Sequence, residues 1–155
     1  MIFNKINWKH LIIAIIICQL AGIVGSLFTF EAIPTWYSTL AKPDFTPPSW
    51  VFGPAWISLY TLMGGAIYLI WQKKDAIAIR LFSIQLALNA LWSISFFGLK
   101  NPLLGLINII ILWIVLVATI IRFYKIDKNA AYLLIPYLLW SSFATILNLA
   151  IVLLN

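Results

Sequence analysis

The sequence predicts an all-α integral membrane protein, in which five transmembrane helices form one domain spanning residues 1–155. Composition is the first observation behind this prediction: 64% of the residues are hydrophobic and only 9% are charged, whereas a soluble domain carries about 25% charged residues. The second observation is that the long apolar runs show no period-two alternation, which favours helices over a membrane barrel.

Five apolar segments reach the length of about 20 residues that a bilayer-spanning helix needs. They cover residues 11–30, 49–71, 78–98, 103–123 and 130–154. The first segment is expected to be a retained membrane helix. It is longer than the apolar core of a signal peptide, and no small-residue cleavage site follows it cleanly.

Residues 31–48 are expected to form a stiff loop between the first two segments. Pro43, Pro47 and Pro48 lie within six residues of one another. Proline fixes its own φ and pushes the preceding residue toward extended geometry. Because an aromatic membrane-spanning segment follows directly, we predict that this loop is a lid beside a pocket.

Four residues mark predicted helix ends or kinks. Ser49 is a candidate N-cap of the second helix, and Pro54 either opens that helix or kinks its first turns. Pro102 occupies a favourable first-turn position in the fourth helix. Pro136 lies inside the fifth segment and predicts a kink there.

The net charge of +6 is explained by topology signals, so no nucleic-acid partner is expected. One side of the predicted bundle holds only Lys42 and Lys100. The other side holds eight basic residues: Lys5, Lys9, Lys73, Lys74, Arg80, Arg122, Lys125 and Lys128. In a bacterial cytoplasmic membrane, this bias predicts a cytoplasmic N-terminus, with the first loop and the C-terminus outside.

Charged residues are absent from the interior of the five segments, apart from Arg80 and Arg122 at the ends of theirs. This argues against an ion-coupled mechanism and against general acid–base chemistry within the membrane. His10, the single histidine, is expected at the membrane interface, and Cys18 as a small buried hydrophobe. We therefore expect no metal site and no cofactor.

Neutral polar and aromatic residues remain as candidates for a binding site. Trp8, Trp36, Trp50 and Trp71 lie near segment ends, where tryptophan forms interfacial belts, whereas Trp56, Trp92, Trp113 and Trp140 lie deeper. Helical spacing groups four sets on single faces: Gln19, Gly22, Ser26 and Thr29; Trp56, Tyr60 and Met63; Gln85, Asn89, Trp92 and Phe96; Tyr137, Trp140, Ala144 and Asn148.

Such mixed faces should point into the bundle, either for helix packing or for a ligand pocket. Both interpretations stay open for Gln85 and Asn89. For Trp56 and Trp140 we favour the pocket, because an indole packs membrane helices less closely than a small residue does. Small residues four apart, at Ser83 and Ala87 and at Ala21 and Gly25, offer candidate dimer seams.

Several stretches resemble a known family when taken together and in order. The first lies between Trp36 and Trp56 and consists of Trp36-Tyr37, Leu40-Ala-Lys42-Pro43 and Pro47-Pro48-Ser-Trp50-Val-Phe-Gly53-Pro54-Ala-Trp56. The other stretches lie within Leu59–Trp71, Gln85–Gly98 and Leu134–Asn148. They resemble the translocator protein family, also called the tryptophan-rich sensory protein or peripheral benzodiazepine receptor family. Segments 11–30 and 103–123 add little beyond their lengths.

The resemblance implies a five-helix bundle, usually a homodimer, with a pocket under the first loop that binds tetrapyrroles such as protoporphyrin. The resemblance also implies benzodiazepine-type drugs and sterols as possible ligand classes, which some members of the family bind. The family's two pocket tryptophans correspond to Trp56 and Trp140, and its polar third-helix face to Asn89 and Trp92. Some bacterial members are reported to convert protoporphyrin in light.

Two departures from the family pattern are visible. Phe45 stands where the family often has tryptophan, so an aromatic ring is kept. The sterol motif of animal members needs a tyrosine followed by a basic residue near the C-terminus, and residues 144–155 contain neither. Sterol binding by that route is not expected.

Our favoured hypothesis is a membrane receptor or carrier for porphyrin-like ligands that regulates tetrapyrrole level or transport. Trp56 and Trp140 would stack on the macrocycle, while Asn89 and Tyr60 would offer hydrogen bonds. The predicted ligand contacts also include Trp50, Trp92 and Ala144, and the predicted lid residues are Trp36, Pro43, Pro47 and Pro48. Two alternatives stay open: a light- and oxygen-dependent enzyme that degrades protoporphyrin through Trp56 and Trp140, and a structural membrane subunit without a ligand.

Overall fold

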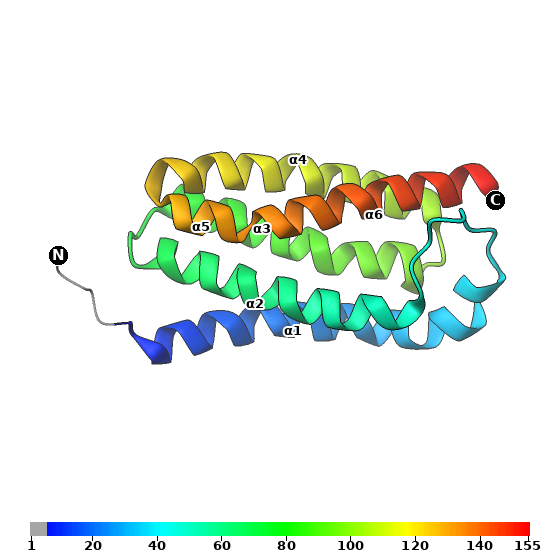
Figure 1. Cartoon of the computed structure of the whole chain (residues 1–155), viewed down its shortest axis with the longest axis horizontal. Helices are drawn as coiled ribbons and strands as arrows, with labels where there is room; N and C mark the ends of the chain where they lie inside the picture. Colours follow the sequence, from blue (N-terminus) through cyan, green and yellow to red (C-terminus); the bar gives the residue numbers. More distant parts are fainter. Residues whose placement is uncertain (1–5) are drawn as a thin grey trace.

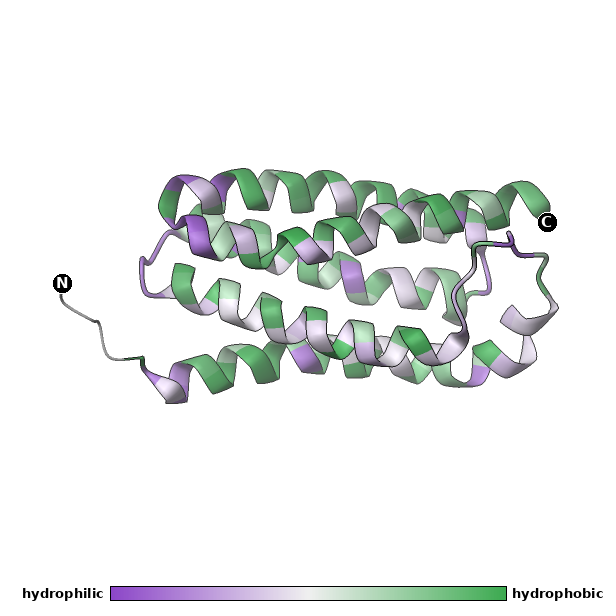
Figure 2. Cartoon of the chain, in the orientation of Figure 1, coloured by the Kyte–Doolittle hydropathy of each residue, from purple (hydrophilic) through white to green (hydrophobic). Residues whose placement is uncertain are grey.

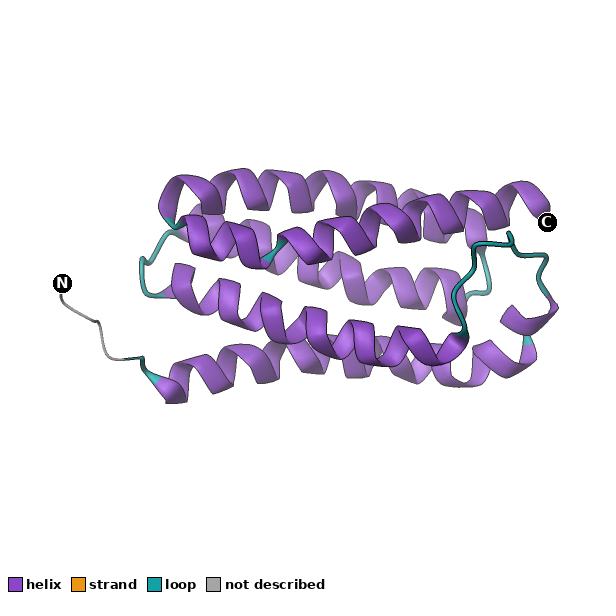
Figure 3. Cartoon of the chain, in the orientation of Figure 1, coloured by secondary structure: helices purple, strands orange, loops and turns teal. Residues whose placement is uncertain are grey.

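The computed structural model describes residues 6–155, which are almost entirely helical and contain no strand (Figure 1, Figure 3). The helices are α1 (Trp8–Thr35), α2 (Phe52–Trp71), α3 (Ala76–Ser93), α4 (Pro102–Ile126), α5 (Lys128–Leu133) and α6 (Ile135–Leu154). Three short turns are η1 (Tyr37–Thr39), η2 (Ser49–Val51) and the π-helical η3 (Ile94–Gly98). Five helical segments are long and apolar enough to cross a membrane, which confirms the predicted class.

The five spans pack as a closed ring. α1 packs against α2 and α3, α4 packs against α3 and α6, and α5 contacts α2 and α4. Figure 1 shows the spans side by side along the long axis of the molecule. One end of the bundle, which we call the loop end, carries residues 36–51, the turn before α4 and the end of α6.

The first span is longer than expected. α1 continues to Thr35, with Pro34 inside its last turn, so the expected loop over residues 31–48 begins only at Trp36. Packing explains the extra turn: Ala32 is buried in an aromatic cluster with Phe96 and Phe97. This burial holds a helical turn that the proline alone would disfavour.

The fifth span is interrupted, as Pro136 predicted. α5 ends at Leu133, Leu134 forms a turn, and Pro136 is the second residue of α6. Proline has no N–H to donate to the carbonyl one turn earlier, so the hydrogen-bond ladder is broken at this point. The span therefore consists of two helices, which share α4 as a packing partner but differ in their contact with α2.

Two helix starts show contrasting outcomes. Ser49 is not an N-cap: it lies inside η2, whose start has no side-chain capping bond, and Pro54 falls in the first turn of α2. Pro102 is the first residue of α4, as predicted, and Asn101 caps this helix by accepting a hydrogen bond from Leu104 N at 2.9 Å.

Hydrophilic residues gather at the two ends of the bundle, as Figure 2 shows. At the end opposite the loop end, the Arg122 guanidinium donates to the Asp75 carboxylate at 2.6 Å, which joins α4 to the start of α3. This bond, followed by the one from Ala78 N, lowers the pKa of Asp75. Lys5, one of the eight basic residues assigned to this end, lies outside the described residues.

Candidate functional site

A cavity of about 410 Å³ lies in the half of the bundle nearest the loop end. Its wall is formed by α1, α2, α3, η3 and α6, with Tyr37 of η1 and Ser49 of η2 at its edge. The volume is within the range of about 300–1,000 Å³ that is common for small-molecule sites. The cavity is therefore large enough for a drug-sized ligand.

The break in the fifth span makes room for this cavity. α5 packs closely along α2, whereas α6 packs mainly on α4 and touches α2 at few residues. The fifth span and α2 thus separate beyond Leu134, toward the loop end. The broken fifth span therefore keeps α4 as a partner along its whole length and loses most of its contact with α2 beyond Leu134.

Aromatic rings from α2 and α6 form one wall of the cavity. Trp56 stacks on Tyr60, with ring centroids 5.4 Å apart and planes at 27°. Trp140 presents its edge to Trp56 at 6.5 Å and 82°. Phe52 and Phe143 pack on Trp140 from either side along the cavity. Edge-to-face and offset contacts of this kind are the stable geometry for aromatic clusters.

The π-helical turn η3 builds the facing wall. In the turn, Ser95, Phe96 and Phe97 are all buried, although a regular α-helix would carry three consecutive residues away from a common side. Trp92 stacks on Phe96 at 5.4 Å. The turn therefore directs two phenylalanines toward the cavity, and π turns occur frequently at functional sites.

A hydrogen-bonded polar chain lies behind the aromatic wall. Tyr60 donates its hydroxyl proton to Asn89 Oδ1, and Asn89 Nδ2 donates to Tyr137 Oη at 2.8 Å. These bonds tie α2, α3 and α6 together. Asn89 and Tyr137 are almost completely buried, so each bond satisfies a group that would otherwise be costly in a membrane interior.

A second polar link closes the cavity toward α4. Trp92 Nε1 donates to Asn148 Oδ1 at 3.1 Å, and Asn148 Nδ2 donates to the Pro102 carbonyl at 2.8 Å. Trp92 and Asn148 both line the cavity. Because their polar groups are already paired, they present mainly flat or neutral surface to a ligand.

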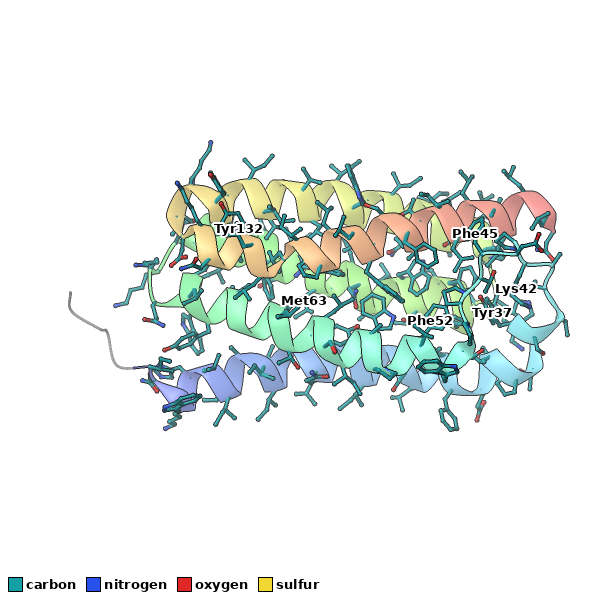
Figure 4. The ribbon with its side chains drawn as sticks, viewed as in Figure 1. Tyr37, Lys42, Phe45, Phe52, Met63 and Tyr132 are labelled. Carbon is teal, nitrogen blue, oxygen red and sulfur yellow. The ribbon has the colours of Figure 1, made fainter. Side chains whose placement is uncertain are left out.

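No charged side chain lines the cavity among the described residues, and these residues contain no cluster of ligands that could hold a metal ion. The nearest cation at the loop end is Lys42, whose Nζ donates to the Tyr37 and Leu40 carbonyls at 2.8 and 2.9 Å. Burial raises the pKa of Tyr37, so its phenol stays neutral. Figure 4 shows Tyr37, Lys42 and Phe52 at this end.

The structure brings most of the predicted ligand contacts together. Trp56, Tyr60, Trp92, Trp140 and Ala144 line the cavity. Asn89 lies one layer behind it, bonded to Tyr60. Gln85, on the same face of α3, is fully buried away from the cavity.

The remaining tryptophans lie elsewhere. Trp50 is 75% exposed and does not line the cavity, which differs from the prediction. Trp113 donates from α4 to Ser142 Oγ at 2.8 Å, also outside the cavity.

The predicted lid residues pack around the cavity without lining it. Trp36 places its ring edge against Phe96 at 5.5 Å, and Pro43 lies beside the end of α6. Pro47 and Pro48 also lie outside the cavity wall. The loop is tied down where Ala41 N donates to Asn155 Oδ1 and Asn155 Nδ2 donates to the Ala41 carbonyl, both at 3.0 Å.

Five aromatic wall residues belonged neither to the predicted ligand contacts nor to the faces grouped by helical spacing: Phe30, Tyr37, Phe52, Phe97 and Phe143. Helical spacing could have found three of them. Phe30 follows Ser26 by one turn, Phe52 precedes Trp56 by one turn, and Phe143 follows Trp140 by three residues. Phe97 could not be found in this way, since its orientation depends on the π turn. Tyr37 belongs to a short turn with no periodic pattern.

Comparison with known proteins gives a consistent result. The sequence model of the TspO/MBR family matches residues 14–154. The chain is 47% identical to the tryptophan-rich protein TspO of Archaeoglobus fulgidus, over 96% of this chain and 99% of that protein. It is 38% identical to the translocator protein of Homo sapiens, over 84% of this chain and 80% of that protein. It is 34% identical to the tryptophan-rich sensory protein of Cereibacter sphaeroides, over 97% of this chain and 94% of that protein.

Proposed function

This chain belongs to the TspO/MBR family of membrane proteins, and from that premise we propose that it is a receptor or carrier for porphyrin-like ligands. The ligand would occupy the aromatic cavity between α1, α2, α3 and α6. Binding there would regulate the level or the transport of tetrapyrroles. The observation that carries the proposal is the cavity itself, whose walls are aromatic and uncharged.

The chemistry of the walls fits a large, flat, apolar ring. Trp56 and Trp140 offer indole surfaces to a macrocycle, and aromatic pairs contribute roughly 0.5–1.5 kcal/mol beyond the burial of their area. Tyr60 adds its ring to the cavity wall, while its hydroxyl donates to Asn89 behind that wall. A metal-free porphyrin needs no axial ligand from the protein, so protoporphyrin is the natural probe.

The first test is a titration of the purified protein with metal-free protoporphyrin in the dark, followed by tryptophan fluorescence quenching. We expect saturable binding that weakens in Trp56→Phe and in Trp140→Phe, because each change removes part of the stacking surface. Trp8→Phe is the control, since Trp8 is 65% exposed at the start of α1 and does not line the cavity. Equal affinities of all four proteins would contradict the assignment of the site.

A specific arrangement favours a second candidate, a light- and oxygen-dependent enzyme that degrades protoporphyrin. Trp140, Trp56 and Tyr60 form a continuous series of ring contacts, and the series continues through Asn89 to Tyr137. Such a series could relay an electron from an excited ligand. Illumination in air should then change the ligand spectrum. Loss of that change in Trp56→Phe and Trp140→Phe, measured at ligand concentrations that saturate each variant, would separate catalysis from binding. A structural subunit without a ligand is less consistent with an open cavity of this size.

The family resemblance also underlies the proposals of a homodimer and of benzodiazepine-type drugs as further ligands. Gly25 is unsuitable for a dimer seam, because it is buried against Ser93 of the same chain. Ser83 and Ala87 are both exposed on α3 and remain available. Measurement of the molecular mass of the detergent-solubilised protein tests whether it is a dimer. If the dimer seam includes Ser83 and Ala87, Ala87→Leu should shift the protein toward the monomer.

A further inference from the structure

The cavity wall includes side chains that also form part of the lipid-facing surface. Phe30 is 84% exposed, Ile57 is 61% exposed and Ile23 is 55% exposed, yet all three line the cavity. Ser26 and Gly53, which also line it, are exposed too. These residues belong to α1 and α2, and the remaining exposed wall residue, Ser49, lies in η2 directly before α2. The cavity therefore opens sideways, between the loop-end halves of these two helices.

The opening has a definite lower limit. Gln19 Nε2 donates to the Ile57 carbonyl at 2.9 Å and to Thr61 Oγ1 at 3.1 Å, which binds α1 to α2. Gly22 lies directly against the Tyr60 ring, where an added Cβ would clash. Below these contacts the two helices are closely packed, since a Cβ added at Gly64 would lie 2.5 Å from Ile15 Cα. Above them, cavity-lining residues of both helices are exposed.

The neighbouring seam between α1 and α3 is closed. A Cβ added at Gly25 would lie 2.9 Å from Ser93 Oγ, and one added at Gly98 would lie 2.9 Å from the Phe28 ring. At Gly53, by contrast, an added Cβ would meet no atom within 4 Å. The free space around Gly53 thus distinguishes the seam between α1 and α2 from the closed seam between α1 and α3.

The route from water at the loop end is obstructed. Residues 40–48 lie over that end, held by the two hydrogen bonds between Ala41 and Asn155 and by contact of the Phe45 and Phe143 rings. Passage through the loop would have to break these bonds, whereas passage between α1 and α2 breaks none. A flat apolar molecule also dissolves far better in hydrocarbon than in water.

We propose that ligands enter and leave the cavity from the lipid bilayer, through a lateral portal formed by Ile23, Ser26, Phe30, Gly53 and Ile57. The proposal rests on the proposed function, because it concerns the same cavity and a flat apolar ligand. Filling the portal should raise the barrier to passage in both directions. It should therefore slow association and dissociation together, whereas loss of a wall contact such as Trp140 should mainly speed dissociation.

The experiment uses the full chain in ligand-free vesicles of phosphatidylcholine and phosphatidylglycerol, which are mixed with vesicles of the same lipids loaded with metal-free protoporphyrin. Stopped-flow tryptophan quenching in the dark measures the association rate, and dilution into empty vesicles measures the dissociation rate. Gly53→Leu and Ser26→Phe narrow the portal from opposite sides. Ser58→Phe is the matched control, because Ser58 is exposed, bonds a carbonyl of its own helix as Ser26 does, and does not line the cavity.

We expect both portal variants to slow association and dissociation by about tenfold, and the control to stay within about twofold of the unmodified chain. Unchanged rates in both portal variants would overturn the portal. Faster exchange in Asn155→Ala, combined with unchanged portal variants, would assign entry to the loop instead. If the unmodified chain shows no saturable binding in the equilibrium titration, both the proposed function and the portal fail. If it binds the ligand but the rates of the portal variants are unchanged, only the portal fails.

Discussion

At the residue scale, Asn89 shows how a side chain can serve both of the roles that helical spacing left open. Its amide is a packing element, because it joins α2 to α6 through Tyr60 and Tyr137. It also supports the cavity, because it holds the hydroxyl of a wall residue in place. The periodic pattern identified the correct face of α3 but not which residues on it reach the cavity.

We predict that Asn89→Leu lowers the free energy of unfolding by about 1–2 kcal/mol, because it leaves the hydroxyls of Tyr60 and Tyr137 buried without their shared partner. Thermal unfolding in detergent, followed by circular dichroism, measures the change. Asn129→Leu is the control, since Asn129 is exposed and only its backbone N–H is hydrogen-bonded. Similar unfolding midpoints for the two variants would show that the amide bridge contributes little.

At the element scale, the pairing of α1 with α2 depends on close backbone approach. A Cβ added at Gly64 would lie 2.5 Å from Ile15 Cα, an atom that cannot move aside without moving the helix. Small residues permit this approach, which is how membrane helices gain packing energy in the absence of a hydrophobic drive. The same close approach sets the lower limit of the lateral portal.

Gly64→Ala should therefore destabilise the protein by about 1–3 kcal/mol through overpacking. The adjacent Gly65→Ala is a matched control, because its Cβ would make an ordinary contact of 3.5 Å with Leu133 Cδ1. Alanine also favours a helix over glycine by about 1 kcal/mol, so this control should be neutral or stabilising. The two midpoints can be compared by thermal unfolding in one detergent, and equal destabilisation would refute the seam argument.

Two other elements depend on local departures from the regular helix. The π turn η3 brings Phe96 and Phe97 into the bundle, and the break at Leu134 sends α6 away from α2. Pro136 made the second departure predictable, because proline is a local signal. The first has no comparable signal in the sequence, so the segment 78–98 was expected to be regular throughout.

At the scale of the whole molecule, the charges divide between the two ends of the bundle. Lys42 and Lys100 lie at the loop end, and the other described basic residues lie at the opposite end. From the positive-inside rule we predict that the loop end lies outside the cytoplasm. This orientation would make the portal open into the outer leaflet.

A labelling experiment on intact bacterial cells tests the orientation. In a Cys18→Ala background, Asp44→Cys should react with a membrane-impermeant maleimide, whereas Lys73→Cys should react only after lysis. Both positions are exposed, so neither result can be attributed to burial. The unmodified chain is the control, because Cys18 is buried and should stay unlabelled. The opposite labelling pattern would reverse the assigned topology.

By itself, the sequence determined the class of the protein, the five spans, the break near Pro136 and four of the aromatic residues that line the cavity, namely Trp56, Tyr60, Trp92 and Trp140. These properties follow from apolar length, from proline chemistry and from helical spacing, all of which are local along the chain. The motifs between Trp36 and Trp56 also indicated the family, because their residues and their order can be recognised along the chain without reference to the packing of the helices.

Only the tertiary structure decided where the cavity lies and where it opens. These features depend on the distance between helices far apart in sequence: the contact of Gly22 with Tyr60, the divergence of α6 from α2, and the closure of α1 against Ser93. It also placed Trp50 at the surface and showed that residues 31–35 are helical. Such outcomes are set by packing between helices, which no local pattern in the sequence encodes.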